Sequence, residues 1–383
     1  MRFNIWNSPK IPLPGVLSFV VDNRGKTVPT SKSGHILIAT NCVRNENLYP
    51  SYEKIRYLSE DTYQNWFRAH PVPGDILFVC KGTPGRTCMV PDPVDFCIAQ
   101  DMVALRVNPQ IVYNKYLLVV LRSKRIQKQI EQTSVGDVIP HFKKSFFDQI
   151  LIPVPPMHIQ QIIGDFYFAF SKKVELNKEI NNNLEQQVSV IFQSWFENFE
   201  LTNGIFPENW HYQELSTIAD IESGKRPPVK SEICNQETPI SIVGAASVMG
   251  FTSKANHTNK ILVTGRVGTH GVIQRFSTPC WTSDNTLVIT SPYYEFTNQI
   301  LHRIDYSSMN RGSTQPLITQ GDMKKVVVLV PDDETLVKFE KFAGSLMSKW
   351  EANNKENVKL ASLRDTLLPK LMSGELDVSD IDL

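Results

Sequence analysis

Two long stretches of the chain show the apolar spacing of an amphipathic α-helix. No proline occurs between Pro156 and Pro207, and apolar residues recur every three or four positions from Ile159 to Trp195. A second such stretch begins at Leu336, and we expect its helix to end at Pro369. This pattern predicts two long helices, each with a narrow apolar seam. A helix of about 38 residues would span roughly 57 Å.

Asparagines interrupt both apolar seams, at Asn177 and residues 181–183 in the first helix and at Asn353, Asn354 and Asn357 in the second. A polar residue in such a seam lowers stability but fixes the register of paired helices. We therefore expect the two helices to form a coiled-coil-like antiparallel pair. The alternative is that these asparagines lie on solvated helix faces.

The segment before each long helix contains short β-type runs separated by proline and glycine, which predicts a mixed α and β domain. The expected strands are 36–39, 75–79, 102–107 and 149–154 in the first segment and 241–244, 260–264, 286–290 and 325–330 in the second. Helices are expected at 60–68 and 114–132. The chain is thus predicted to be an α+β protein with globular domains at 1–155 and 204–331, a spacer helix at 156–203, and a second spacer helix with a tail at 332–383.

The second half of the chain repeats the first at nearly constant offsets. Gly82, Gly85 and Asp101 match Gly265, Gly268 and Asp284 at an offset of 183 residues (265 − 82). Later pairs share an offset of 176 (351 − 175), namely Gly136 and Gly312, Pro140 and Pro316, Pro155 and Pro331, Glu175 and Glu351, Asn177 and Asn353, and Leu184 and Leu360. The change of offset indicates an insertion or deletion within a duplicated unit. We expect a pseudo-twofold molecule with two similar binding parts.

Composition and charge narrow the class of protein only slightly. The chain has 383 residues, is 41% hydrophobic and carries a net charge of +1, which is typical of a globular protein of two or three domains. No apolar run is long enough for a membrane helix or a secretion signal, so we expect a cytoplasmic protein. The six cysteines show no CxxC spacing and are expected to be reduced thiols. Because the net charge is small, any site for a polyanion must be a local cluster of cations.

Sequence motifs for catalysis are incomplete. Gly25-Lys26-Thr27 and Gly224-Lys225 lack the earlier glycine of a phosphate-binding loop. Ser291-Pro292-Tyr293-Tyr294 lacks both the acid or amide and the second proline of an amino-methyltransferase motif. No metal-nuclease signature, HExxH or Gly-x-Ser-x-Gly pattern occurs in the sequence. We therefore expect a binding protein without its own metal or cofactor. A self-contained DNA-modifying enzyme and a helical-hairpin adaptor that does not touch DNA are the alternatives.

Basic and amide residues recur on glycine-rich loops in both globular parts. These residue types bind phosphates and pair bidentately with base edges. Two such readers on a helical spacer would contact one face of the duplex about one turn, 34 to 36 Å, apart. The candidate DNA-binding residues are Arg24, Lys26, Lys81, Arg86, Lys143 and Lys144 in the first part and Lys225, Arg226, Lys230, Arg266, His270, Arg275, Arg311 and Gln315 in the second.

Segments with a recognisable pattern are 22–27, 206–210, 221–227 and 313–316 in the globular parts and 174–177, 192–196 and 363–376 in the helical parts. Through these segments the chain resembles, over nearly its whole length, the specificity (S) subunits of type I restriction-modification systems. The first globular part has a proline-rich start and no clear counterpart of Phe206–Trp210.

The resemblance implies a DNA-binding subunit without catalytic activity of its own. Its two target recognition domains would each read one half of a bipartite sequence in double-stranded DNA, and its spacer helices would dock two modification (methyltransferase) subunits. Those partners would bind S-adenosylmethionine and methylate adenine, and a restriction subunit would use ATP and Mg. The docking residues that it implies are Glu175, Asn177, Leu184, Trp195, Phe196, Leu363, Arg364, Leu367 and Leu371.

Overall fold

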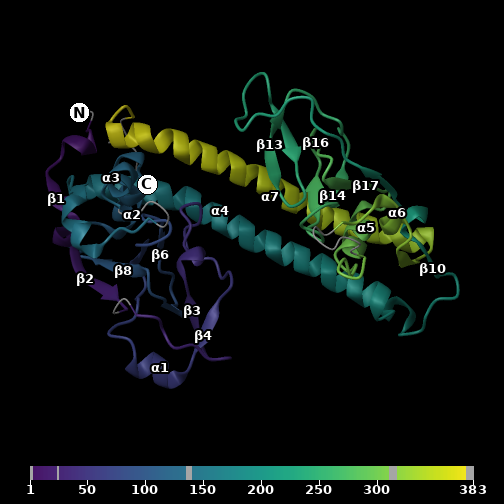
Figure 1. Cartoon of the computed structure of the whole chain (residues 1–383), viewed down its shortest axis with the longest axis horizontal. Coiled ribbons are helices and arrows are strands. Elements are labelled where there is room, and N and C mark those ends of the chain that lie inside the picture. The colour runs from purple at the N-terminus through teal and green to yellow at the C-terminus, as the bar shows by residue number, and fades with distance from the viewer. Residues whose placement is uncertain (1–2, 24–25, 135–139, 310–316, 377–383) are drawn as a thin grey trace. The chain divides into compact units, whose positions relative to one another are not determined.

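The chain forms two compact units (Figure 1). The computed structural model describes residues 3–23, 26–134, 140–309 and 317–376. The first unit consists of Met1–Glu179 and Asn353–Leu383, and the second unit consists of Ile180–Ala352. Each unit therefore contains a set of strands and a part of each long helix.

The strands of the first unit form three sheets with the orders β2-β8-β5-β6, β4-β3-β7 and β1-β9. All neighbouring strands are antiparallel except β3 and β7, which are parallel. The bounds are β1 (Lys10–Pro12), β2 (Leu17–Asp22), β3 (His35–Ile38), β4 (Arg56–Leu58), β5 (Ile76–Val79), β6 (Thr87–Met89), β7 (Phe96–Ile98), β8 (Met102–Val107) and β9 (Leu151–Pro153).

The second unit repeats this arrangement strand for strand. Its sheets have the orders β11-β17-β14-β15, β13-β12-β16 and β10-β18, and again only one pair, β12 with β16, is parallel. The bounds are β10 (His211–Glu214), β11 (Asp220–Ser223), β12 (Ile240–Val243), β13 (Val248–Thr252), β14 (Ile261–Gly265), β15 (Gln274–Phe276), β16 (Trp281–Thr282), β17 (Thr286–Thr290) and β18 (Val327–Val330). The predicted internal repeat and the α+β class are confirmed.

Backbone hydrogen bonds correct the register of the repeat in the globular parts. Phe142 N–H donates to the Cys80 carbonyl at 2.8 Å, and Ile318 N–H donates to the Arg266 carbonyl at 3.0 Å. The donors Phe142 and Ile318 are separated by the predicted offset of 176 (318 − 142). The acceptors Cys80 and Arg266 are separated by 186 (266 − 80). The predicted offset of 183 is therefore wrong around this turn.

The glycines of the turn agree with the corrected offset. Gly82 and Gly268 have positive φ angles of 85° and 83°, and Gly85 and Gly271 have φ angles of 87° and 76°. Both pairs are 186 residues apart (268 − 82), and left-handed backbone of this kind favours glycine. Gly265, which the sequence pattern paired with Gly82, is instead the last residue of β14.

The beginning of each unit also has a counterpart in the other. Ser8 N–H donates to the Ile5 carbonyl at 3.0 Å, and Trp210 N–H donates to the Pro207 carbonyl at 3.2 Å. The donors and acceptors of these two bonds are both 202 residues apart (210 − 8). The same offset continues into β1 and β10, which both pair with the last strand of their unit. Asn4–Ser8 is thus the structural counterpart of Phe206–Trp210, which the sequence comparison did not find.

Five shorter α-helices accompany the described strands: α1 (Glu60–Asn65), α2 (Asn114–Arg122), α3 (Lys124–Thr133), α5 (Tyr294–Leu301) and α6 (Gln320–Lys324). The single helix expected at 114–132 is wrong, because Ser123 adopts an extended conformation between α2 and α3. The Ser123 hydroxyl accepts a hydrogen bond from Ile126 N–H at 3.4 Å and so caps the start of α3.

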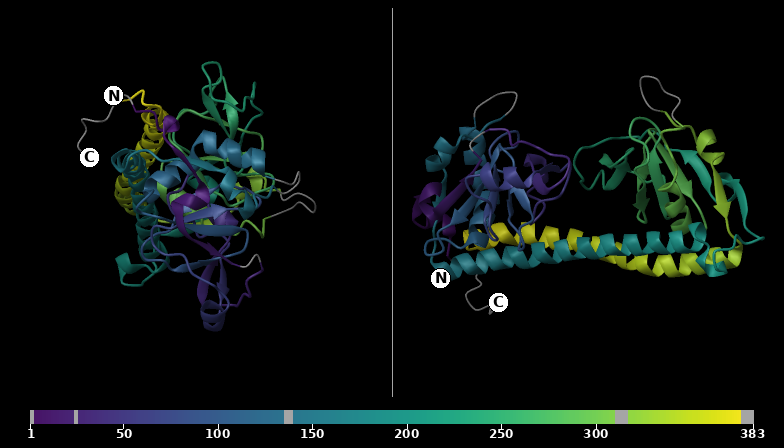
Figure 2. Two further views of the ribbon diagram at one scale, coloured as in Figure 1. Left: turned by 90° about the vertical axis from the view of Figure 1, so that its left-hand side faces the viewer. Right: turned by 90° about the horizontal axis from the view of Figure 1, so that it is seen from below.

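The two long helices are α4 (Met157–Phe192) and α7 (Asp333–Ser373). Within the first unit Ser171 contacts Arg364 and Asn177 contacts Asn357, so the partner number falls as the α4 number rises. Within the second unit Asn181 contacts Trp350 and the Phe192 ring contacts Phe339 in the same sense. The predicted antiparallel pairing is confirmed, and Figure 2 shows these helix segments side by side in each unit.

The end of α7 differs from the prediction. The helix continues through Pro369 to Ser373, and Leu371 and Met372 are buried in the core of the first unit. Proline inside a helix removes one hydrogen bond and its ring crowds the carbonyl of the preceding turn, and burial of the last turn of α7 offsets this cost. The helix ends before Gly374, whose φ angle of 76° suits a C-terminal glycine.

Each unit has a main hydrophobic core between its four-stranded sheet and its helices. In the first unit Phe78, Leu105 and Tyr116 are fully buried there, and in the second unit Leu287, Phe296 and Phe339 take this place. Parts of both long helices contribute to each core, through Ile163 and Leu371 in the first unit. The helices are therefore integral to the units and position the loops of the sheets.

Candidate nucleic-acid interface

The four-stranded sheet of the first unit brings several predicted DNA-binding segments to one edge. β2 ends at Asp22, β5 ends at Val79 and β8 begins at Met102, and the antiparallel pairing places these ends side by side. The β5–β6 turn lies here, and its Gly82 N–H donates to the Pro140 carbonyl at 2.9 Å. We call this surface, formed by residues 22–26, 80–86, 99–101 and 140–144 where described, the first recognition edge.

Most of the predicted cations of the first unit are available at this edge. Lys26, Lys81, Lys143 and Lys144 are exposed, and Arg86 is half-buried. The Lys144 ammonium forms an ion pair with the Asp22 carboxylate, which joins the end of β2 to the segment after Phe142. Arg24 lies outside the described residues.

The second unit forms an equivalent second recognition edge from residues 223–226, 244–247, 266–273 and 282–285. β11 ends at Ser223, β14 ends at Gly265 and β17 begins at Thr286. Lys225 N–H donates to the Thr282 carbonyl at 2.9 Å, and Arg266 N–H donates to the Asn285 carbonyl at 2.8 Å. The backbone carbonyl of Ser283 would lie 2.1 Å from a Cβ at Gly224, so only glycine fits at this approach.

The predicted cations of the second unit divide between this edge and the neighbouring sheet. Lys225 and Arg226 are exposed at the edge, while Arg266 and His270 are half-buried there. Lys230 is exposed beside Gly250 of β13. Arg311 and Gln315 lie outside the described residues.

Several buried polar atoms at the second recognition edge have no hydrogen-bond partner among the described residues. They are Arg266 Nε, His270 Nε2 and Ser283 Oγ, and Thr264 Oγ1 lies next to them on β14. The other ring nitrogen of His270, Nδ1, lies 3.1 Å from the Gly265 carbonyl oxygen. Buried polar groups of folded proteins are nearly always paired, but Thr252 Oγ1, Arg275 Nε and Asn298 Oδ1 of the same unit also have no partner in the described part of the chain, so these atoms do not by themselves distinguish the edge.

Arg275 does not belong to either edge. Its guanidinium forms two hydrogen bonds with the Glu295 carboxylate, at 2.8 and 2.6 Å, and the two side chains are only 10% and 4% exposed. Burial alone would lower the pKa of Arg275, but the hydrogen bonds and charge of Glu295 outweigh burial and raise that pKa. The guanidinium also lies 5.0 Å from the centre of the Tyr294 ring. We therefore remove Arg275 from the candidate DNA contacts and assign it to the stability of the second unit.

Most of the implied docking residues lie inside the units. Asn177, Leu184, Phe196 and Leu371 are buried, and Trp195 packs against the core of the second unit. Of the rest, Leu363 is 39% exposed and Leu367 is half-buried. More exposed apolar residues on the two helices are Leu176, Ile180, Val190, Val337, Phe342 and Val358. These six residues are the better candidates for a partner surface.

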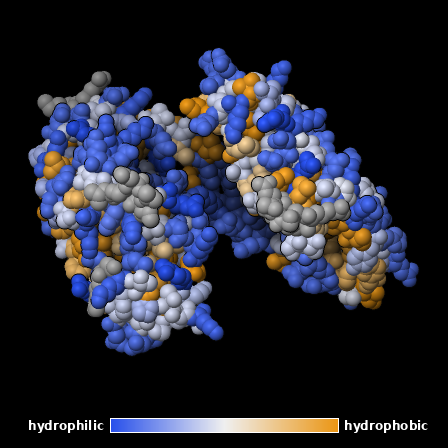
Figure 3. Space-filling view, in the orientation of Figure 1, coloured by the Kyte–Doolittle hydropathy of each residue, from blue (hydrophilic) through white to orange (hydrophobic). Residues whose placement is uncertain are grey.

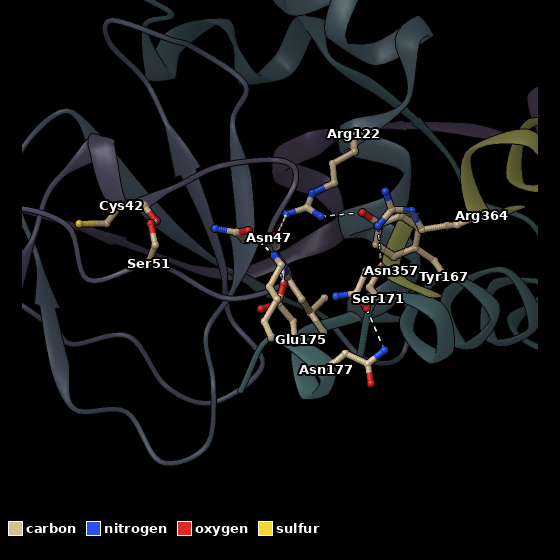
Figure 4. Close-up of polar contacts among 12 residues, drawn as sticks. Cys42, Asn47, Ser51, Arg122, Tyr167, Ser171, Glu175, Asn177, Asn357 and Arg364 are labelled. Atoms are coloured by element: carbon tan, nitrogen blue, oxygen red, sulfur yellow. Dashed lines mark hydrogen bonds and ion pairs between the residues drawn. The ribbon is translucent and has the colours of Figure 1, made fainter. Parts of the chain in front are cut away.

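A polar network holds the recognition part of the first unit on the long helices (Figure 4). Arg122, at the end of α2, donates to the Tyr167 hydroxyl on α4 at 2.6 Å and to the Asn47 carbonyl at 2.7 Å. Glu175 of α4 accepts a hydrogen bond from Leu48 N–H at 3.3 Å. The guanidinium of Arg364, on α7, lies over the Tyr167 ring, 5.1 Å from its centre. Glu175 and Arg364 thus orient the recognition part within its own unit.

The second unit also uses an arginine near the end of a short helix to contact a long helix. Arg303 follows α5, donates to the Ser189 carbonyl on α4 at 3.3 Å, and lies 4.2 Å from the centre of the Phe192 ring. Its Nε also donates to Glu197 at 2.5 Å. Sequence analysis missed Arg122 and Arg303, although a cation at the end of a short helix before each long helix is a signal that could have found them.

Other candidate chemistry is limited in the described part of the chain. None of its helices is long and apolar enough to cross a lipid bilayer. Within the same residues no group of three or more His, Cys, Asp or Glu side chains is placed to hold a metal ion. Five cysteines are buried and unpaired, and Cys234 is exposed. Burial raises the pKa of the Cys88 thiol to about 12, so it stays protonated at neutral pH.

Comparisons with known proteins agree with the geometry. Residues 30–186 match the family model of the type I restriction modification DNA specificity domain. The chain is 25% identical to the type I restriction enzyme MjaIX specificity subunit of Methanocaldococcus jannaschii, over 70% of this chain and 71% of that protein. It is 21% identical to the HindI specificity subunit of Haemophilus influenzae, over 79% and 86% of the two chains.

A solved structure shows the same fold. The S subunit of the type I restriction-modification system from M. genitalium superposes with a TM-score of 0.57 at 18% identity, over 95% of this chain and 96% of that one. This likeness agrees with the two repeated units and their long helices. The chain is thus similar in sequence and in fold to specificity subunits of type I restriction-modification systems, and its residues 30–186 match the DNA specificity domain of these systems.

Proposed function

We propose that this chain is the non-catalytic DNA specificity subunit of a type I restriction-modification complex. The observation that carries the proposal is the duplication of the recognition edge. Both four-stranded sheets have the same strand order, and the same edge of each carries glycine turns with exposed lysines, Lys81 in the first unit and Lys225 in the second. Glycine turns let backbone amides approach phosphates, and the cations add affinity.

The two edges differ in their side chains, as expected if each reads a different half of a bipartite target. At the corrected register, Cys80 of the first edge corresponds to Arg266 of the second. Arg86 likewise has Val272 as its counterpart, at the same offset of 186 (272 − 86). Equal scaffolds with different base-reading residues support one reader for each half-site.

The long helices provide the surface for modification subunits in this proposal. Exposed apolar residues occur on both helices, with Leu176 and Val358 in the first unit and Val190 and Val337 in the second. Because each unit contains a segment of both helices, we propose two modification subunits. These partners would bind S-adenosylmethionine and methylate adenine in the cytoplasm, and a restriction subunit would use ATP and Mg.

The proposal is tested with the chain purified together with its modification subunits. We expect gel shifts on genomic fragments at graded salt to show selective binding, and sequencing of methyladenine in the source cell to give one split motif. Binding should weaken with salt according to the number of phosphates contacted. A complex that is indifferent to DNA at low salt would show that the chain is an adaptor without a DNA-reading role.

A further inference from the structure

The second recognition edge carries a continuous exposed tip without charge. After β12 the chain turns through residues 244–247, where Gly244 N–H donates to the Ser247 carbonyl at 2.8 Å. The four residues Ala246, Ser247, Val248 and Met249 are all exposed, and the last two are 45% and 40% exposed. No charged residue occurs between Thr238 and Lys254. Consecutive exposed apolar residues are rare on a protein surface unless they bind something.

This tip stands at the second recognition edge itself. Gln274 Nε2 donates to the Gly244 carbonyl at 2.8 Å, and Ser283 N–H donates to the Val243 carbonyl at 3.0 Å. The Ala245 Cβ would lie 3.0 Å from a Cβ at Gly265. The tip is therefore fixed to the same strand ends that carry Arg266 and Lys225. Figure 3 shows hydrophobic side chains among hydrophilic ones at the end of the second unit that carries β13 in Figure 1.

Cations flank the uncharged tip. Lys225 and Arg226 are exposed where β11 ends, Arg266 lies in the β14–β15 turn, and Lys230 is exposed beside β13. An apolar surface bordered by cations complements duplex DNA, in which phosphates border the stacked bases. This complementarity in charge favours DNA over an apolar protein partner as the occupant.

The shape of the tip selects one groove of DNA and one chemical group within it. The major groove, about 12 Å wide, admits a two-stranded β-ribbon, whereas the minor groove is only about 6 Å wide. The C5-methyl group of thymine is the apolar group that base edges present in the major groove. We propose that the tip formed by Ala246–Met249 reads an A·T base pair of the second half-site through contact with the thymine methyl group. The proposal rests on the DNA-binding function proposed above.

The first unit lacks an equivalent short tip. Its β3 and β4 are joined by residues 39–55, which contain the charged side chains of Arg44, Glu46, Glu53 and Lys54. Arg44 and Glu53 form an ion pair at 2.6 Å within this connection. A short apolar tip in one unit and a long charged connection in the other is the expected difference between readers of unlike half-sites. The methyl contact is therefore assigned to the second half-site alone.

Uracil substitution tests this contact, because uracil differs from thymine in DNA only by the missing methyl group. The complex of the chain with its modification subunits first selects fragments from genomic DNA that contains thymine. The sequences of the selected fragments give both half-sites. Duplexes carrying uracil at one thymine position at a time are then titrated. We expect one position of the second half-site to bind roughly three- to tenfold more weakly, the scale of burying one methyl group.

A double variant, Val248→Ser with Met249→Gln, links that effect to the tip. It should bind the thymine and uracil duplexes equally at this position while it keeps its selectivity in the first half-site. Val327→Ser, at a 64% exposed apolar residue of β18 in the same unit, is the matched control and should keep the discrimination. Thermal unfolding of both variants checks that they are folded.

The outcomes separate this inference from the proposed function. Selective binding of thymine-containing DNA with equal affinity for every uracil duplex overturns the methyl contact and leaves the DNA-binding function standing. Discrimination that persists in the double variant also overturns the assignment to this tip. Failure to select any fragment from natural DNA would overturn the DNA-binding function itself.

Discussion

Arg122 donates a hydrogen bond to the Tyr167 hydroxyl at 2.6 Å and thereby joins the end of α2 to the long helix α4. The same guanidinium donates to the backbone carbonyls of Asn47 and Thr87. It therefore ties together a connection between strands, a strand and two helices of the first unit. Together with Glu175 and Arg364, this side chain orients the first recognition edge on the long helices.

Replacing Arg122 with Ala should destabilise the first unit. The change leaves two carbonyls and a hydroxyl without their charged donor, and we expect the free energy of unfolding to fall by about 2 to 3 kcal/mol. Urea unfolding followed by tryptophan fluorescence measures this loss. Lys124→Ala, at an exposed residue of α3, is the control and should change stability by less than about 0.5 kcal/mol. Equal stability of the two variants would contradict the assigned role.

Replacing Arg275 should affect stability and not DNA binding. Arg275→Met leaves the buried Glu295 carboxylate unpaired, and we expect a loss of about 3 to 5 kcal/mol, much of it regained in the double variant with Glu295→Met. The slope of log affinity against log salt should stay unchanged in that double variant. Lys225→Ala provides the contrast, because loss of a phosphate contact reduces this slope by about 1. A reduced slope in the Arg275 double variant would restore Arg275 as a DNA contact.

Much of the strand and helix arrangement could be predicted from local patterns. β8 and β17 have the bounds that the sequence predicted, 102–107 and 286–290, because apolar runs between turn residues define them. The long helices were equally clear from their apolar period. The end of α7 could not be predicted, because a helix was expected to stop at Pro369. Burial of Leu371 in the core, which local sequence does not show, stabilises the last turn.

The register of the repeat could not be predicted, because the second turn contains the spacing Gly-x-x-Gly twice. Gly265, Gly268 and Gly271 offer two matches to Gly82 and Gly85, and only the backbone conformation and strand pairing decide between them. The role of a charged residue could not be predicted either where its partner is distant in sequence. Arg275, in β15, forms its ion pair with Glu295, 20 residues further along the chain, and the sequence around Arg275 gives no sign of this partner.

Glu340 should make the stability of the second unit depend on pH. It accepts hydrogen bonds from the N–H groups of Glu295 and Phe296 at 3.1 and 2.7 Å, at the start of α5. Burial raises its pKa from the ordinary 4.5 to about 7, although these hydrogen bonds act in the opposite direction. At pH values between about 4.5 and 7, Glu340 is therefore protonated in the folded protein and ionised in the unfolded chain.

The sign of the effect follows from that difference in proton binding. The stabilisation linked to the Glu340 proton is complete below about pH 4.5 and is lost as the pH rises through about 7. In the Glu340→Gln variant the free energy of unfolding should change less between about pH 5.5 and 8 than in the wild type, as measured by urea unfolding. Glu334→Gln, at an exposed carboxylate of the same helix, should keep the wild-type profile. Parallel profiles for wild type and Glu340→Gln would contradict the raised pKa.

Asn177 should fix the helix pair through its hydrogen bonds and not through apolar packing. Its Nδ2 donates to Glu356 at 2.8 Å and to Asn357 at 2.9 Å, and the residue is 1% exposed. Asn177→Asp removes the donor and places a carboxylate beside Glu356, so we expect a loss of about 3 kcal/mol at pH 8. Adding Glu356→Gln should recover part of it, as measured by urea unfolding. A stable Asp variant without that second change would show that Asn177 contributes little.

Arg86 and Arg266 should each act on one half-site. Arg86 follows the β5–β6 turn of the first recognition edge, and Arg266 begins the β14–β15 turn of the second. If each arginine pairs bidentately with a base, replacement by Ala should weaken binding by about 1 to 3 kcal/mol and relax selectivity at one position of its own half-site. Selection of bound fragments by the complex with its modification subunits, followed by sequencing, measures both effects.

Comparison of the two variants provides the control for each arginine, because the half-site read by the unchanged unit should keep its sequence preference. Lys81→Ala and Lys225→Ala, at exposed lysines of the same edges, should instead weaken binding to all sequences evenly and reduce the salt dependence. An arginine variant that behaves like these lysine variants is a phosphate contact. Loss of preference in both half-sites from a single arginine change would contradict the independence of the two recognition edges, on which the bipartite reading depends.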